Sequence, residues 1–164
     1  MYKEEEKELL RVLGDVIIDV QHIGSTSVPG MIAKPIIDIM VAVKNLGDLA
    51  LCIGGLEKLH YRFLGTGGRP GRLFFVKGQP ENVTHHLHLV EKDSHYWRDN
   101  IFFRDYLRTH DNIAKEYAKL KLELAAKFKT DRESYKICKS KFIKRCQARQ
   151  FEYSENKNSN YVPF

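Results

Sequence analysis

The sequence predicts an α/β (α+β) protein, with a mixed β-sheet, flanking helices and a C-terminal helical segment. Three features predict this class. A β-branched stretch at residues 16–23 is followed by a turn of small residues, and residues 36–43 form the most apolar stretch of the chain. In the last third, apolar residues recur at steps of three and four, as in amphipathic helices. Strands followed by a run of helices indicate a sheet with a helical cap or bundle.

The first half of the chain is expected to run helix, strand, turn, strand. Residues 3–13 are rich in Glu, Lys and Leu, which favour a helix, and Gly14 ends it. Residues 16–23 predict a strand, and the small residues at 24–30 predict a turn. Residues 36–43 predict a central strand covered on both faces, because the run is apolar throughout except for one aspartate.

The second half is expected to contain a helix, three short strands and three helices. A flexible loop with four glycines interrupts the strands at residues 65–71. The apolar stripe between residues 113 and 128 predicts one of the final helices, and residues 130–133 form a capping box that starts the last. The expected ranges of the other elements are 46–59 for the helix before the strands, 61–64, 73–77 and 86–91 for the strands, and 96–108 for the first C-terminal helix.

Length and composition favour one domain. The 164 residues are 43% hydrophobic and 29% charged, which is ordinary for a globular protein. We expect a single domain over residues 1–150 and a C-terminal tail over 151–164. No apolar run approaches the roughly 20 residues that span a bilayer, and the charged N-terminus lacks a signal peptide's pattern. These features predict a cytoplasmic protein without a membrane partner, and leave the oligomeric state open.

Asp38 is the first residue that suggests chemistry. A carboxylate in an apolar strand costs several kcal/mol unless it is paired or binds a metal. One interpretation is a structural partner, such as Lys34. The other is a functional carboxylate, acting as a metal ligand or general base, because strand ends in α/β sheets present side chains to clefts.

The turn before Asp38 suggests phosphate binding. Gly24 lets a phosphate approach the backbone, and the hydroxyls of Ser25, Thr26 and Ser27 add donors. A Gly-Ser turn at a strand end, followed by an aspartate in the next strand, matches the layout of the nucleotidyltransferase superfamily signature.

Longer segments carry a more specific resemblance. Residues 22–30, HIGSTSVPG, and residues 33–39, AKPIIDI, closely resemble the GrpB family, as do residues 84–88 and 103–108. The resemblance implies a nucleotidyltransferase-like fold. In active members of that superfamily, two carboxylates two residues apart hold divalent metal, and a third comes from a neighbouring strand. Asp38 fills the first position, but Met40 fills the second and cannot bind a hard cation.

The neighbouring strand offers histidines instead. Strand alternation places Leu87 and Leu89 on one face and His86 and His88 on the other. Two histidines at i and i+2 can chelate a transition metal or act as general acid and base. We therefore expect Asp38, His86 and His88 to be catalytic and to hold a divalent metal, which would be Mg, Mn or Zn. The expected cleft is lined by those three residues together with His22 and Ser25.

Four basic residues complete the predicted site as phosphate clamps: Lys34, Arg69, Arg72 and Arg104. Ordinary surface charge remains the alternative for each. The predicted partner is a nucleotide or phosphorylated small molecule, with nucleotidyl or phosphoryl transfer as the reaction. The alternative is a binding module that has lost transfer chemistry. RNA ranks last, because there is no aromatic-rich strand of the RNA-binding type, and the substrate itself is not predicted.

Overall fold

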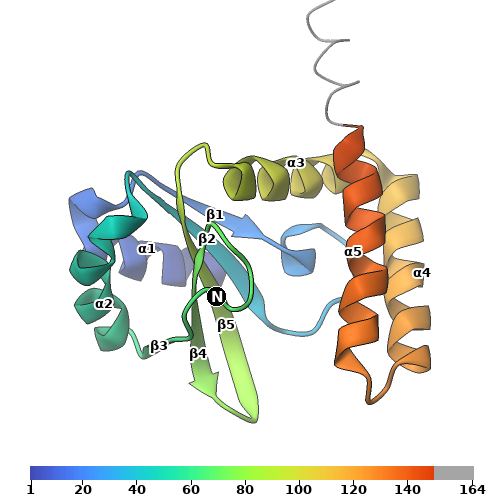
Figure 1. The fold of residues 1–164 in the computed structure, drawn as a ribbon, viewed down its shortest axis with the longest axis horizontal. Coiled ribbons are helices and arrows are strands. Elements are labelled where there is room, and N and C mark those ends of the chain that lie inside the picture. Colours follow the sequence, from blue (N-terminus) through green and yellow to red (C-terminus); the bar gives the residue numbers. More distant parts are fainter. Residues whose placement is uncertain (150–164) are drawn as a thin grey trace, which may run out of the picture. The chain divides into compact units, whose positions relative to one another are not determined.

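The computed structural model describes residues 1–149, which form two compact units, residues 1–104 and a second unit beginning at Asp105 (Figure 1). Whether they fold together as the single domain predicted over residues 1–150 stays a prediction, and the predicted tail at 151–164 lies outside the described residues. The helices are α1 (Tyr2–Leu13), α2 (Leu49–Lys58), α3 (His95–Thr109), α4 (Asp111–Lys127) and α5 (Arg132–Ala148). The strands are β1 (Asp19–Ile23), β2 (Ile37–Val43), β3 (Tyr61–Phe63), β4 (Leu73–Gln79) and β5 (Asn82–Glu91).

The five strands form one mixed sheet in the order β1-β2-β5-β4-β3. Only the central pair, β2 and β5, is parallel; the other neighbours are antiparallel. The register of the β2–β5 pair places Asp38 opposite His86 and Met40 opposite His88. The mixed sheet with flanking helices confirms the predicted fold class.

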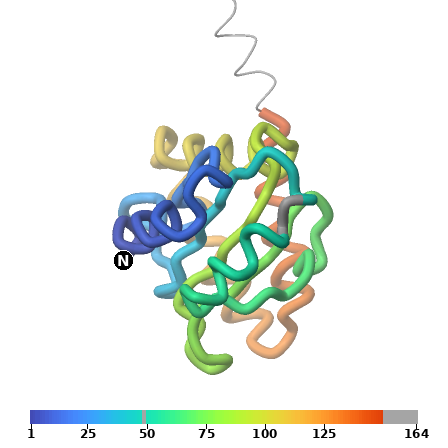
Figure 2. The backbone as a smooth tube through the Cα atoms, turned by 90° about the vertical axis from the view of Figure 1, so that its left-hand side faces the viewer, coloured from blue at the N-terminus to red at the C-terminus, as the bar shows by residue number. Residues whose placement is uncertain are grey.

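Helices α1 and α2 cover one face of the sheet, and Figure 2 shows them lying side by side. Leu9 of α1 and Leu56 of α2 are fully buried there. They pack in one cluster with Ile39, Leu87 and Leu89 from the central strands. Each fully buried side chain of this size contributes about 1.5–3 kcal/mol, so this cluster is the main core of the unit.

The start of α3 packs on the opposite face. Trp97 lies in a second cluster with Met40, Ala42 and Val90, all of them buried. The alternation of β2 therefore separates two sets of side chains, with Ile39 and its neighbours facing α1 and α2, and Met40 facing α3. Asp38 shares the parity of Met40, so it belongs to this second face.

The second unit contains an antiparallel hairpin of α4 and α5. Tyr117 and Phe142 stack across it, with ring centroids 5.2 Å apart, and Leu124 and Cys146 are also buried. The predicted capping box is off by one residue, because the side chain of Asp131, not Thr130, accepts from the Ser134 backbone amide at 3.0 Å. A carboxylate is among the strongest N-caps, so it displaces the neighbouring threonine.

The starts of β1 and β5 differ most from the predicted bounds. Residues 14–16 form a 3-10 turn, so β1 begins later than predicted. Strand β5 begins at Asn82, before the predicted start at residue 86, because β4 and β5 form a tight hairpin that pairs Gln79 with Asn82. No helix within residues 1–149 is long and apolar enough to cross a membrane.

Candidate functional site

Asp38 is the centre of a polar network on the face of the sheet that α3 covers in part. Its Oδ1 atom accepts a hydrogen bond of 3.0 Å from Nδ1 of His86 and lies 3.5 Å from Nε2 of His88. The parallel register of β2 and β5 brings the three residues together, because it sets Asp38 directly beside His86. The Asp38 side chain keeps 27% of its exposure, so the carboxylate is not sealed in the core.

The hydrogen bond to Asp38 orients His86. An ionised carboxylate only accepts hydrogen bonds, so Nδ1 of His86 carries the proton that faces it. The Nε2 atom then lies on the far side of the ring, away from Asp38. The His86 side chain is 31% exposed. The dyad therefore resembles the carboxylate–histidine pairs in which the carboxylate fixes the tautomer of a working imidazole.

His88 is held in a fixed tautomer from its other side. Nη1 of Arg72 donates a hydrogen bond of 2.6 Å to Nδ1 of His88, and the Tyr96 hydroxyl lies 3.1 Å from the same atom. A guanidinium has no acceptor, so Nδ1 of His88 must carry the lone pair and Nε2 the proton. That proton points towards Asp38, at a distance beyond a normal hydrogen bond.

The surroundings shift two pKa values in the same direction. Burial opposes the charged form of Asp38, but the hydrogen bond from His86 and the nearby Nε2–H group of His88 outweigh it and hold the pKa of this carboxyl well below its usual range. Burial also lowers the pKa of His88, and the opposing effect of Asp38 does not reverse it. The network at neutral pH therefore consists of an ionised Asp38 and a neutral His88.

Arg72 is buried rather than poised on a surface loop. Only 7% of the residue is exposed, and its guanidinium donates to the carbonyl oxygens of Thr66 and Gly67 at 3.0 and 3.1 Å. The face of the Phe74 ring lies 4.4 Å from it. With its donors directed at these carbonyls and at His88, Arg72 braces the site. The prediction that Arg72 clamps a phosphate is therefore corrected. Its guanidinium is bound by carbonyls of the glycine-rich loop and by His88.

Gly24 brings the turn against Asp38. Its φ is +71°, a conformation that L-residues rarely adopt, and a Cβ atom there would lie 2.5 Å from Oδ2 of Asp38. The Ser27 hydroxyl donates to the Gly24 carbonyl at 2.6 Å and is buried. Ser27 thus closes the turn and does not face a ligand, contrary to its predicted role. The half-buried Ser25 lies between them, at the start of the 3-10 turn Ser25–Ser27.

His22 does not join the two other histidines. In the antiparallel register it is paired with Ile39, so it lies on the face that α1 and α2 cover. There its ring stacks on Tyr2 of α1 at 4.6 Å. Its Nε2 atom also lies 3.0 Å from Oγ1 of Thr26. The expected cleft is corrected on this point, because strand alternation separates His22 from Asp38 by the thickness of the sheet.

The remaining predicted clamps lie apart from the network. Arg104 donates to the side chain of Gln21 at 2.6 Å and to the His22 carbonyl at 3.1 Å, so it ties α3 to β1. Lys34 and Arg69 are exposed. The sequence interpretation did not include Tyr96 or Phe74 in the site. Phe74 is the cross-strand neighbour of His88, and the Tyr96 hydroxyl lies 3.1 Å from Nδ1 of His88. Both contacts depend on strand pairing and helix packing, which local sequence patterns do not give.

Three residues were predicted to hold a metal. In the structure His86 is hydrogen-bonded to Asp38, Nε2 of His88 lies 3.5 Å from the same carboxylate, and both histidine nitrogens that face the carboxylate carry protons. Within residues 1–149, no group of three or more His, Cys, Asp or Glu side chains is arranged to hold a metal ion. This arrangement does not fit a three-ligand centre, so metal binding stays a prediction.

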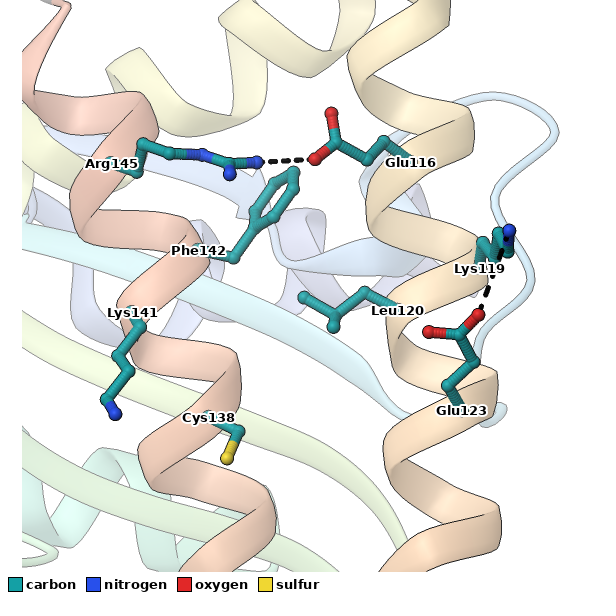
Figure 3. A pocket seen from close by; sticks show the side chains of 8 residues that line it. All are labelled: Glu116, Lys119, Leu120, Glu123, Cys138, Lys141, Phe142 and Arg145. Atoms are coloured by element: carbon teal, nitrogen blue, oxygen red, sulfur yellow. Dashed lines mark hydrogen bonds and ion pairs between the residues drawn. The ribbon is translucent and has the colours of Figure 1, made fainter.

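A shallow groove of about 480 Å³ also lies on the α4–α5 hairpin, between the two helices (Figure 3). It is edged by exposed ion pairs, Arg145 with Glu116 at 2.5 Å and Lys119 with Glu123 at 3.9 Å. None of the predicted site residues lines it. The hydrogen-bonded histidine and arginine side chains described above lie around Asp38 and not at this groove.

Comparison with known proteins identifies the relatives of this chain. A model of the GrpB protein family matches residues 1–149. The chain belongs to the GrpB family. The glutamate-rich protein GrpB of Alkalihalophilus pseudofirmus is 39% identical over 145 residues, covering 85% of this chain and 83% of that protein. The UPF0157 protein YqkA of Bacillus subtilis is also 39% identical, over 95% of this chain, which spans only 46% of YqkA.

Two solved structures share the fold of this chain. The crystal structure of GrpB from Enterococcus faecalis has a TM-score of 0.79 and 33% identity, covering 92% of both chains. Terminal uridylyl transferase 4 from Trypanosoma brucei, solved with bound CTP, has a TM-score of 0.50 at 16% identity. It covers 78% of this chain and 40% of the transferase. The second likeness is one of fold alone.

Proposed function

We propose that this chain binds a nucleotide or another phosphorylated small molecule beside Asp38 and transfers a nucleotidyl or phosphoryl group from it. One observation carries the proposal. An ionised, partly exposed aspartate lies against a glycine turn and orients the partly exposed ring of His86. Such an arrangement holds a carboxylate and a proton acceptor at one surface. The uridylyl transferase that shares the fold was solved with bound CTP, which makes a nucleotide the first ligand class to test.

The side chains divide the work in this proposal. His86 accepts the proton of an attacking hydroxyl at Nε2 while the new oxygen–phosphorus bond forms. The bond to the leaving phosphate breaks at the same phosphorus, and that group departs with the electron pair. Asp38 stabilises the imidazolium through Nδ1, because its carboxylate is ionised when the proton arrives. A divalent metal, where one binds, would neutralise phosphate charge.

A second candidate is a binding module without turnover. Met40 favours it, because this side chain is fully buried at the position where active transferases carry their second carboxylate. The tautomer of His88 favours it too, since a proton on Nε2 and a guanidinium on Nδ1 leave no lone pair for a metal. The two candidates share the ligand class and differ only in whether the bond between phosphorus and the leaving group is broken.

The test combines binding with turnover. CTP, ATP and GTP are screened by thermal shift and then incubated with Mn²⁺ or Mg²⁺, and release of pyrophosphate or phosphate is measured. A ligand at 100 times its Kd stabilises the fold by about 2.7 kcal/mol. His86→Ala should abolish release, whereas the matched control His95→Ala, an exposed histidine on α3, should not.

The outcomes separate the candidates. Release that depends on His86 supports transfer, and stabilisation without release supports the binding module. Calorimetry with Mn²⁺ on the wild type and on Asp38→Asn tests the predicted metal. If no nucleotide or sugar phosphate stabilises the wild type, both candidates fail.

A further inference from the structure

The three histidines of β5 differ in what their ring nitrogens contact. Nδ1 of His88 accepts a hydrogen bond from Arg72, and its Nε2 atom carries a proton. Nε2 of His85 is buried, and the whole residue is only 7% exposed. Neither ring therefore offers a lone pair to a molecule that arrives from solvent. His86 lies between them in the sequence and points its ring differently.

His86 presents a lone pair to solvent. Its Nδ1 atom donates to Oδ1 of Asp38 at 3.0 Å, which leaves the lone pair of the neutral ring on Nε2. Within residues 1–149, no protein group is hydrogen-bonded to this Nε2 atom. The buried histidine nitrogens without a partner in the same residues belong to His85 and His88 and not to His86. Nε2 of His86 is therefore open to solvent.

Asp38 supports a positive charge on the His86 ring. The carboxylate is ionised, because the two neighbouring imidazole N–H groups hold its pKa low. A carboxylate bonded to one imidazole nitrogen makes the other nitrogen more basic and stabilises the cation that forms when this nitrogen makes a new bond. His60 and His95 are more exposed than His86, but no carboxylate in the described part of the chain is bonded to either ring. They serve as internal references for an ordinary surface histidine.

We propose that His86 is a phosphorylation site, at which Nε2 attacks the phosphorus atom of a small acyl phosphate. The lone pair of Nε2 forms the bond to phosphorus, and the bond between phosphorus and the acyl oxygen breaks. The carboxylate anion leaves with that electron pair. The ring becomes a phosphoimidazolium that keeps its Nδ1 proton against the ionised Asp38, so no proton has to move. An acyl phosphate is the donor class because its leaving group is a stable anion that needs no general acid.

This reaction goes beyond the proposed transfer function. A general base and a nucleophile both need an accessible lone pair on Nε2, and they differ in which atom attacks phosphorus. In the proposed transfer the attacking atom is the hydroxyl oxygen of a second substrate, whereas here it is the ring nitrogen itself. The inference depends on the geometry of Asp38 and His86 and needs no nucleotide. A phosphorylated ring has no lone pair left, so the modification would also stop His86 from acting as a base.

Acetyl phosphate is the probe, incubated with the whole chain in the absence of nucleotide. Intact mass measures the gain of a phosphoryl group, and fragmentation of peptides locates it. A phosphohistidine is lost in acid and kept in alkali, which distinguishes it from a phosphate ester and from an acetylated lysine. In the wild type, His86 should be phosphorylated about tenfold faster than His60 or His95 in the same sample. This comparison needs no variant, so misfolding does not affect it.

A pair of variants tests the role of the carboxylate. Asp38→Asn should slow phosphorylation of His86 about tenfold, because the amide oxygen can still accept from Nδ1 but cannot stabilise the charge of the ring. The matched control is Asp93→Asn, which removes an exposed carboxylate just after β5. This control should react at the rate of the wild type.

Three results would overturn the proposal. One is the absence of a phosphoryl group on His86. Another is a reaction of His60 or His95 as fast as that of His86, which would indicate surface chemistry alone. The third is an unchanged rate in Asp38→Asn. Because the experiment contains no nucleotide, its failure leaves the test of nucleotidyl transfer by pyrophosphate release unaffected, and failure of that transfer does not bear on phosphorylation of His86.

Discussion

Arg72 and His88 are joined by a hydrogen bond of 2.6 Å in which a buried guanidinium donates to a buried neutral imidazole. The bond fixes the histidine as the Nε2–H tautomer and directs its proton at Asp38. The same guanidinium binds two carbonyls of the glycine-rich loop, at Thr66 and Gly67. The conformation of this loop and the protonation state of His88 are therefore coupled through Arg72.

Arg72→Met should destabilise the fold by about 3 kcal/mol. The change removes charged hydrogen bonds, worth roughly 1.5–3 kcal/mol each, and leaves buried acceptors without a donor. Urea unfolding measures the loss, and Arg69→Met, an exposed change in the same loop, should stay within about 0.5 kcal/mol of the wild type. In the wild type, ¹⁵N spectra of the His88 ring should show Nε2 protonated and Nδ1 bare. The opposite tautomer would contradict the assigned network.

Gly24→Ala should lower the free energy of unfolding by more than Gly30→Ala does. The new Cβ would lie 2.5 Å from Oδ2 of Asp38, and the positive φ adds strain of about 1–3 kcal/mol. Gly30→Ala is the matched control, because Gly30 has a φ of +72° and a Cβ there meets nothing within 4 Å. Unfolding free energies of both variants separate the two effects. Equal losses would mean that the contact with Asp38 is unimportant.

Acid should destabilise the wild type through Asp38. The folded pKa of this carboxyl is depressed, so its contribution to stability is complete above the unfolded value of about 3.9 and is lost as the pH falls towards the folded value. Asp38→Asn should have a lower free energy of unfolding than the wild type at pH 7. Its free energy of unfolding should also fall less than that of the wild type as the pH is lowered. Urea unfolding between pH 7 and pH 2.5 checks both. Parallel curves for the two proteins would show that Asp38 is not held ionised by its histidines.

The neutral state of His88 gives a second pH dependence. Its folded pKa is lowered, so the unfolded chain binds the extra proton first and stability declines as the pH falls below about 6.5. The ring resonances of His88 in the folded protein should therefore titrate with a midpoint below 6.5, because its pKa is lowered. A midpoint at or above 6.5 in that titration would mean that burial does not keep this ring neutral.

Glu5 and Lys77 should clamp α1 to the sheet. Both carboxylate oxygens of the buried Glu5 lie 2.8 Å from Nζ of Lys77. Glu5→Ala should cost about 3–5 kcal/mol, because it leaves a half-buried charge without its partner. The double variant with Lys77→Met should recover much of that loss. Glu8→Ala, which removes an exposed partner of Arg11 on the same helix, should leave the unfolding midpoint almost unchanged.

The fold could be predicted because its signals are local. Residues 36–43 form an apolar run that only Asp38 interrupts, and the apolar stripes of α4 and α5 continue through several turns, so a short window of sequence is enough to predict each of these elements. The sharing of one face by His86 and His88 also followed from alternation alone. The bounds of β1 and β5 did not, because a 3-10 turn and a hairpin register depend on neighbours in space.

The sequence by itself determined the family, the order of the elements and the conjunction of Asp38 with two histidines, since each rests on spacing along the chain. Only the tertiary structure decided which groups face Asp38. It moved His22 to the opposite face through the register of β1, and it turned Arg72 inward to bond His88. The physical reason is that a side chain's partner is fixed by strand pairing and burial, which join residues that no short window of sequence connects.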